Sequence, residues 1–260
     1  MVKKIVGTGV LLVLALALQA GVKMYTLKSP DGKVKLEVTA GQGIAYSLFY
    51  DGRLLLKPSR IALHTDLPEA DHWENIRITG TKQRHVSETV QAPFYRVKEF
   101  GIDCNELELR LNNGFSLLMR AYNDGMAYRF VAGRKGEMTV VEERAEFNFA
   151  DDFEAYIPYS TNPKDPWNMA FQNFYTKAPL TQYNTELPAF LPLTVDAGAV
   201  KLTLLESDLE AYPGMFVRGD GKTPALKGVF AAYPQETFKN KWRCQETVKT
   251  RRPYIARVAG

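Results

Sequence analysis

The sequence is poor in the residues that build metal, redox and nucleotide sites. Among its 260 residues are two cysteines and three histidines. His64, His72 and His85 are scattered along the chain, and a surface or packing role is the default for each. The CxxC and HExxH spacings of metal sites are absent, as are the GxGxxG and Walker patterns of phosphate-binding loops. The sequence therefore gives no support for a zinc centre or for nucleotide binding.

The two cysteines, Cys104 and Cys244, stand far apart in the sequence. A domain of this size does not need a disulfide to fold, so we expect two free, buried thiols. Because an exported chain permits disulfides, a bridge between them stays open as the alternative.

The chain also lacks the strong positive charge that is typical of nucleic-acid-binding proteins. Its formal net charge is +4 at pH 7. Without Lys3 and Lys4, which belong to the N-terminal segment discussed next, the charge is near +2. We interpret the basic runs at 239–243 and 249–252 as solvated surface, and expect no nucleic-acid partner.

Residues 1–20 have the pattern of a secretory signal peptide. Two lysines precede the apolar stretch 5–18, which is shorter than the about 20 apolar residues of a membrane-spanning helix. A small-residue cleavage site fits after Ala20; a retained membrane anchor is the alternative. Since no second apolar run is long enough to span a bilayer, we expect a mature domain of residues 21–260. It would be secreted to the periplasm or associated with the outer membrane.

Short alternating strands and tight turns dominate the rest of the chain. Residues 107–111 read Leu-Glu-Leu-Arg-Leu, which predicts a strand with one buried and one wet face. Asp51-Gly52 lies between two apolar runs and predicts a hairpin turn in which both residues have positive φ. Further strands are predicted at residues 25–27, 34–38, 44–50, 53–56, 115–122, 126–131, 139–143, 200–205 and 229–232. This pattern predicts an all-β fold of two large antiparallel sheets packed face to face.

Helical signals are few and short. Residues 207–212 predict one or two helical turns, with Ser207 as the N-cap and Pro213-Gly214 as the stop. The neighbouring acids, Glu206, Asp208 and Glu210, are interpreted as side chains of that turn, where acids favour a helix N-terminus. The alternative is a catalytic acid pair.

Residues 156–185 form a long segment with no period of two or of 3.6. Segments of this length inside a domain are usually functional or disordered. Disordered segments are poor in aromatic residues, whereas this one has seven between Tyr156 and Tyr183. The sequence therefore predicts an ordered, irregular loop that builds a surface.

Four stretches of the chain carry a family resemblance. They are LKSPDGKVKLEV at 27–38, YNDGMAYRF at 122–130, FQNFYTKAPL at 171–180, and LPLTVDAG followed by ESDLEAYPGM within 191–215. In this order and spacing they resemble the N-terminal domain of glycoside hydrolase family 97. That family holds secreted bacterial exo-acting α-glucosidases and α-galactosidases, and the resemblance covers nearly all of the mature chain.

The resemblance implies a β-supersandwich that precedes a (β/α)8 catalytic barrel, in the same or a companion chain. The catalytic carboxylates of the family lie on the barrel, so we expect no catalytic residue here and no activity from this chain alone. The implied role is accessory: to brace the barrel, wall the pocket for an α-linked galacto- or gluco-oligosaccharide, and contribute to its calcium site. The alternative is a free-standing carbohydrate-binding module.

The resemblance also implies a position for the calcium ligand. In the family a loop carboxylate helps to hold calcium, and the local pattern places Gln172 at that position. An amide oxygen brings no charge, and calcium affinity follows ligand charge, so calcium binding should be weaker than with a glutamate. Asn168 is a second oxygen donor nearby, and Glu186 is the nearest carboxylate downstream.

Three aromatic residues of the same loop are candidates for stacking on sugar rings: Trp167, Phe171 and Tyr175. They could equally pack the loop onto the sheets or dock against a neighbouring barrel.

Overall fold

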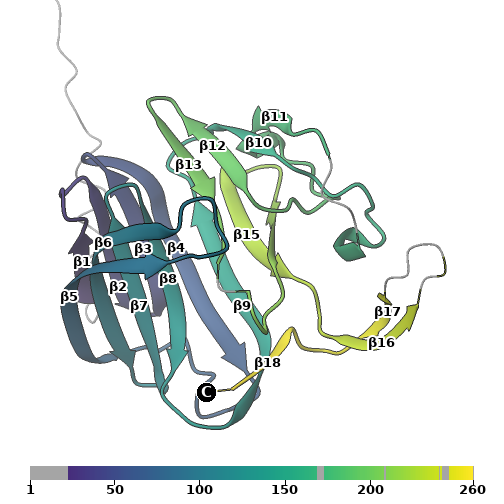
Figure 1. Cartoon of the computed structure of the whole chain (residues 1–260), viewed down its shortest axis with the longest axis horizontal. Coiled ribbons are helices and arrows are strands. Elements are labelled where there is room, and N and C mark those ends of the chain that lie inside the picture. The colour runs from purple at the N-terminus through teal and green to yellow at the C-terminus, as the bar shows by residue number, and fades with distance from the viewer. Residues whose placement is uncertain (1–22, 169–172, 208, 240, 242–245, 260) are drawn as a thin grey trace, which may run out of the picture.

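The computed structural model describes residues 23–168, 173–207, 209–239, 241 and 246–259. Its largest sheet extends from the left side to the middle of the view in Figure 1. In spatial order its strands are β1 (Lys23–Lys28), β2 (Val34–Gly41), β3 (Gly43–Tyr50), β4 (Arg53–Thr65), β9 (Glu137–Asn148), β15 (Ala225–Phe230) and β14 (Met215–Gly219), with β18 (Ala256–Ala259) also on β9. All these pairs are antiparallel.

Smaller sheets accompany this large sheet. One contains β5 (Ile78–Gln91), β6 (Glu99–Leu111), β7 (Phe115–Tyr122) and β8 (Gly125–Ala132), and it packs against β1 and β2. Another contains β11 (Thr176–Pro179), β10 (Glu154–Ile157), β12 (Leu193–Ala197) and β13 (Val200–Leu204). A separate hairpin joins β16 (Pro234–Lys239) and β17 (Glu246–Arg251).

Buried side chains of all the larger sheets belong to one contiguous cluster. In β6 the alternating residues Leu107, Leu109 and Leu111 are buried in it. Burial of such apolar area is the main favourable term in folding. The predicted all-β sandwich is therefore confirmed, with the β5–β8 sheet packed on the β1 and β2 end of the large sheet.

Local turns follow the sequence closely. The φ angles are 48° at Asp51 and 76° at Gly52, as the predicted hairpin turn requires. Each strand predicted from the sequence overlaps an observed strand, but the strands predicted at 53–56 and 107–111 are much shorter than the observed β4 (Arg53–Thr65) and β6 (Glu99–Leu111).

The helical turn predicted over 207–212 does not form in the described residues of that segment. Glu206 instead accepts the backbone N–H of Met215, at 2.7 and 2.9 Å to its two oxygens. The Tyr212 hydroxyl donates to Glu143 Oε2 at 2.7 Å. These long-range bonds stabilise an irregular connection, and the observed helical turns are the 3-10 turns Pro166–Asn168 and Leu180–Gln182. Asp208 lies outside the described residues.

Cys104 is a free, buried thiol on β6, and burial raises its pKa. Its possible partner, Cys244, lies outside the described residues, as does the signal sequence predicted over 1–20. Within the described ranges, no helix combines the length and the apolar character needed to cross a bilayer.

Candidate functional site

The long loop is ordered where it is described, and tyrosines hold it. The rings of Tyr159 and Tyr183 meet edge to face, with centroids 5.0 Å apart. The Tyr159 hydroxyl accepts the backbone N–H of Asn184 at 2.8 Å, and its carbonyl accepts Asn173 Nδ2 at 2.6 Å. Burial raises the pKa of both tyrosines. These contacts agree with the predicted order of residues 156–185, but the segment is not irregular throughout, because β10 ends at Ile157 and β11 spans Thr176–Pro179.

Trp167 packs inward. It lies in the first 3-10 turn, half-buried, with its ring edge-on to Phe216 of β14 at 4.9 Å and 89°. Edge-to-face contact at this distance is a favourable aromatic geometry. The geometry therefore favours packing over sugar stacking for this residue.

Two other aromatic residues of the loop face solvent. Tyr175 is 47% exposed, with its hydroxyl 3.5 Å from the Pro192 carbonyl. Phe174 beside it is fully exposed, although the sequence analysis does not single it out. Phe171, the third stacking candidate, lies outside the described residues.

The calcium ligand set stays a prediction. Gln172 lies outside the described residues; Asn168 lies in the 3-10 turn, but its side chain is not described. Glu186 is exposed, and its backbone N–H donates to Asn184 Oδ1 at 3.1 Å. Among the side chains that are described, no group of three acidic, histidine or cysteine residues is placed to hold a metal.

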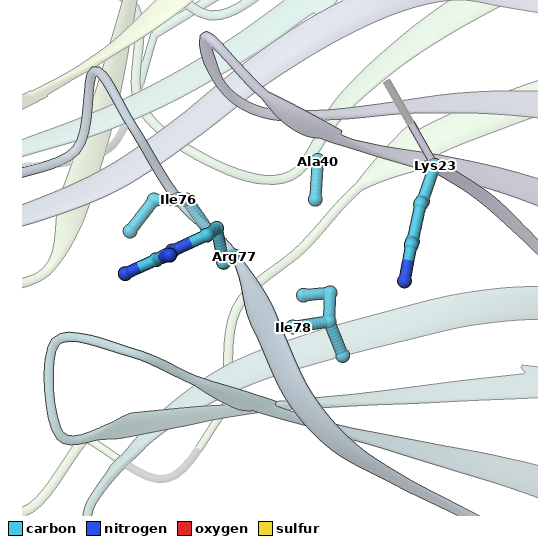
Figure 2. Close-up of a pocket in the computed structure, with 5 residues that line it drawn as sticks. All are labelled: Lys23, Ala40, Ile76, Arg77 and Ile78. Carbon is cyan, nitrogen blue, oxygen red and sulfur yellow. The ribbon is translucent and has the colours of Figure 1, made fainter. Parts of the chain in front are cut away.

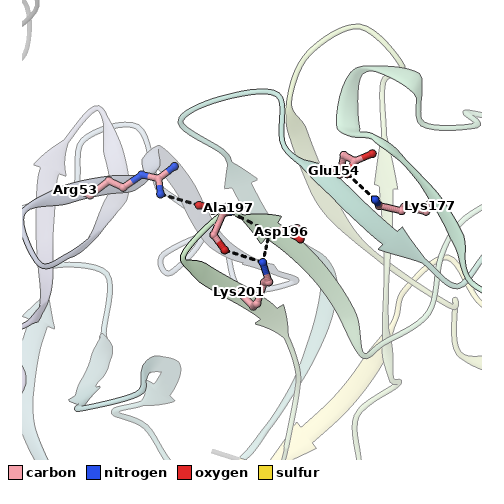
Figure 3. A network of polar contacts seen from close by, with 7 residues as sticks. Arg53, Glu154, Lys177, Asp196, Ala197 and Lys201 are labelled. Carbon is pink, nitrogen blue, oxygen red and sulfur yellow. Dashed lines mark hydrogen bonds and ion pairs between the residues drawn. The ribbon is translucent and has the colours of Figure 1, made fainter.

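The outer face of the β10–β13 sheet adds a polar surface next to the loop (Figure 3). Glu154 pairs with Lys177 at 2.8 Å, and Lys201 pairs with Asp196 and with the Gly198 carbonyl. The Lys201 ammonium lowers the pKa of Asp196, and Glu154 raises that of Lys177.

Tyr156 lies on this face, 37% exposed, with the Lys177 ammonium 6.0 Å from its ring centroid. The hydroxyls of Thr194 and Thr203 lie 3.0 Å apart on the neighbouring strands. Tyr156 is not among the site residues predicted from the sequence. The alternation of residues 155–157 could have identified it: Ala155 and Ile157 are buried, so the side chain of Tyr156 between them points outward. One exposed aromatic ring among charged and hydroxyl groups is suited to a sugar.

Two half-buried carboxyl groups, those of Glu143 and Glu206, interact outside the loop. Burial raises the pKa of Glu143, and the negative charge of Glu206 adds to this. Burial also raises the pKa of Glu206. Both carboxyls accept hydrogen bonds from the protein, Glu143 from Tyr212 and Glu206 from Met215. We therefore assign them a structural role.

A pocket on the opposite side of the chain is lined by Lys23, Ala40, Ile76, Arg77 and Ile78 (Figure 2). Figure 2 shows that the Lys23 and Arg77 side chains point in different directions. Ligand sites need a few convergent polar groups, which this apolar pocket does not offer.

Comparison with known proteins decides the family. The glycosyl-hydrolase 97 N-terminal family model matches residues 27–252. The chain belongs to this family. It is 39% identical over 251 residues to a retaining alpha-galactosidase of Bacteroides thetaiotaomicron, covering 94% of this chain and 38% of that protein. A probable retaining alpha-galactosidase of Streptomyces bingchenggensis is 26% identical over 158 residues, covering 59% of this chain and 24% of that protein.

Solved structures share the fold. A glycoside hydrolase family 97 enzyme in complex with acarbose, from a Pseudoalteromonas species, has a TM-score of 0.66 and 19% identity, covering 79% of this chain and 32% of that one. A beta-arabinopyranosidase has a TM-score of 0.70 and 19% identity, covering 90% of this chain and 38% of that one. This family 97 N-terminal domain thus spans well under half the length of the proteins it matches.

Proposed function

We propose that this chain is the accessory domain of an exo-acting α-glycosidase whose catalytic groups lie on a barrel outside the chain. The observation that carries the proposal is the pairing of 39% identity over 94% of this chain with coverage of only 38% of a retaining alpha-galactosidase. The name of that relative favours an α-linked galactoside over a glucoside as substrate. Within the described residues, the interacting acids Glu143 and Glu206 are engaged by the protein itself.

The loop surface is the part of the domain that would meet the barrel. Exposed apolar groups mark interaction sites, and Phe174 and Tyr175 are adjacent, exposed aromatic residues on the loop. In the complete enzyme they would dock on the barrel, and the neighbouring polar face would wall part of the sugar pocket.

Calcium belongs to the same proposal. By the family resemblance, Gln172 would face calcium held chiefly by carboxylates of the barrel. In a protein that joins this domain to its barrel, Gln172→Glu should tighten calcium binding, because it adds a charged ligand. Asn184→Asp, elsewhere on the loop, is the control. Unchanged or weaker affinity in the Gln172→Glu protein would show that the ligand is misplaced.

Export completes the proposal. Residues 1–20 would direct the chain out of the cytoplasm and be removed, leaving residues 21–260 in the periplasm or at the outer membrane. N-terminal sequencing of the protein from a bacterial periplasmic fraction tests this; retention of residues 1–20 in the isolated protein would contradict it.

The activity test uses purified residues 21–260 with p-nitrophenyl α-galactoside and α-glucoside. We expect no release of p-nitrophenol, while the complete retaining alpha-galactosidase relative, assayed in parallel, hydrolyses the galactoside. Turnover by the chain alone would overturn the accessory role. If Glu143→Gln abolished that turnover, the structural assignment of Glu143 would also be wrong.

A free-standing carbohydrate-binding module is the second candidate, and the exposed Tyr156 on its polar face favours it. Calorimetric titration with galactose, maltose and their oligomers separates the two. Saturable binding by residues 21–260 that is lost in Tyr156→Ala would favour the module, provided that it is kept in the control Tyr95→Ala, which changes an exposed tyrosine in the turn between β5 and β6. Because Trp167 packs inward, Trp167→Ala should leave sugar binding unchanged.

A further inference from the structure

Strand β5 has a long edge with no partner among the described residues. It runs over 14 residues and pairs with β6 on one side only. In Figure 1 it lies at the outer margin of the molecule. The strand contains no proline, and nearly all its side chains are exposed. Unpaired edges of this length and exposure are ready templates for another strand.

The distal half of the β5–β6 hairpin has little support from the rest of its sheet. β7 pairs with β6 only from Cys104 to Arg110, so residues 87–103 form a two-stranded ribbon. Isolated two-stranded ribbons are marginally stable in water. Yet Val90 and Phe100, which face each other across the ribbon, are 40% and 43% exposed. A further strand beside β5 would stabilise this ribbon.

We propose that two copies of the chain pair antiparallel along β5, with Val86 on the two-fold axis. In this register Val86 lies opposite Val86 of the second copy. Residues 84 and 88 are then opposite each other, so that Arg84 meets Glu88 twice. The interface is isologous, as a two-fold dimer requires, and it extends one four-stranded sheet into an eight-stranded sheet by strand addition.

Neighbouring registers match less well. Centring on His85 sets the two His85 rings against each other and Arg84 against Val86. Centring on Ser87 sets Arg84 against Val90. Of these three registers, only the one centred on Val86 has an apolar pair at its centre and oppositely charged residues facing each other beside it. Apolar pairs and pairs of opposite charge across strands both stabilise antiparallel pairing.

The register also joins two rows of side chains in which Val86 and Cys104 are buried and Tyr122 is half-buried. Val86 pairs with Cys104, which pairs with Tyr122, and all three lie on the outer face of the sheet. Across the axis the two rows become continuous. Arg84 already forms an ion pair with Glu106. Because exposed ion pairs contribute little free energy, the pairs between Arg84 and Glu88 add little to the stability of the dimer. Since the interface is small, we expect a weak dimer that depends on concentration.

Sedimentation velocity of residues 21–260 over a range of micromolar concentrations tests the proposal. We expect a reversible dimer. Glu88→Arg places arginine opposite Arg84 and should weaken dimerisation by about tenfold or more. Glu74→Arg makes the same charge change at an exposed turn outside the sheet and should leave the dimer intact. Thermal melting of each monomer confirms that the variants fold.

Two results would overturn the proposal: a monomer at every concentration, or a dimer that Glu88→Arg leaves unchanged. The second result is expected if the copies associate through the tip of the β5–β6 hairpin, and in that case Phe94→Ser would abolish the dimer. Hydrogen exchange locates the contact: amides of β5 should gain protection as concentration rises, while those of β13 should not. Neither result bears on the accessory role, because the glycosidase assay is independent of dimerisation.

Discussion

Replacing the Glu106 carboxylate by an amide is a small chemical change that should clearly lower the stability of this domain. The carboxylate is 5% exposed and is held between two arginines. Arg84 Nε lies 2.6 Å from one oxygen, and Arg120 Nε lies 2.7 Å from the other. Glu106→Gln keeps the shape of the side chain, removes the charge, and leaves one arginine without an acceptor. We expect the domain to be destabilised.

The magnitude follows from the geometry. Hydrogen bonds to charged groups contribute about 1.5–3 kcal/mol each, and breaking a buried ion pair costs about 3–5 kcal/mol. The Arg84 and Arg120 side chains are 54% and 28% exposed, so water recovers part of this loss. We therefore expect a decrease of about 2–3 kcal/mol in the free energy of unfolding. For a domain of this size that lowers Tm by about 4–12 °C.

The pH dependence supplies a second readout. Burial opposes the charge of Glu106, but the hydrogen bonds from Arg84 and Arg120 outweigh it and lower its pKa. A lowered pKa contributes stability that is present above the usual glutamate pKa and is lost as pH falls through the native value. The difference between the two proteins should therefore be constant near neutral pH and shrink in acid.

Urea denaturation across this pH range measures both effects. Glu108→Gln is the matched control, because Glu108 lies on the same face of β6 and accepts a long hydrogen bond, 3.4 Å, from the Ser116 hydroxyl. It should change stability by less than about 0.5 kcal/mol. Equal effects of the two substitutions, or a difference that does not shrink in acid, would refute the reasoning.

Three other outcomes follow from the packing. Trp167→Ala should lower the free energy of unfolding by about 2 kcal/mol in urea, because a half-buried ring loses its contact with Phe216; an unchanged midpoint would mean that the ring does not pack there. The Cys104 thiol should resist Ellman's reagent in the native state and react on unfolding, and prompt native reaction would contradict its burial. Glu143 has a raised pKa, so the stability it contributes is present below the usual carboxyl pKa and is lost as pH rises through the native value. Glu143→Gln should flatten that decline with rising pH in thermal melts, and a decline of unchanged slope would argue against the assignment.

The sequence predicts those parts of the fold that depend on local patterns. Alternation identifies β6, and the Asp51-Gly52 turn has the expected φ angles, because both depend on neighbouring residues. β5 is missed: its sequence, ITGTKQRHVSETVQ, is polar on both faces, as an exposed edge strand can be. Alternation also places Glu106 on the wet face of β6, but arginines from the two neighbouring strands bury it. Pairing across strands is not visible in a local pattern.

For the same reason, the sequence pattern does not distinguish the inward-facing from the outward-facing aromatic residues of segment 156–185. Trp167 turns inward because Phe216, far along the chain, provides a contact, and Tyr156 turns outward because its strand neighbours are buried. The two solvent-facing parts of the surface then differ in chemistry. Around Tyr156 the ion pair of Glu154 and Lys177 is exposed, and a protein partner would have to desolvate it at some cost, whereas sugar hydroxyls can replace its water.

At Phe174 and Tyr175 the opposite holds. Phe174 is fully exposed and the ring of its neighbour is half-exposed, so covering them removes apolar area from water. That gain does not require a sugar, and it is largest against a flat protein surface. The accessory role and the sugar-binding alternative therefore draw on different residues. Phe174→Ala should weaken association with a barrel and spare sugar binding, and Tyr156→Ala should do the reverse. If both substitutions impaired the same property, the surface would be a single site rather than two.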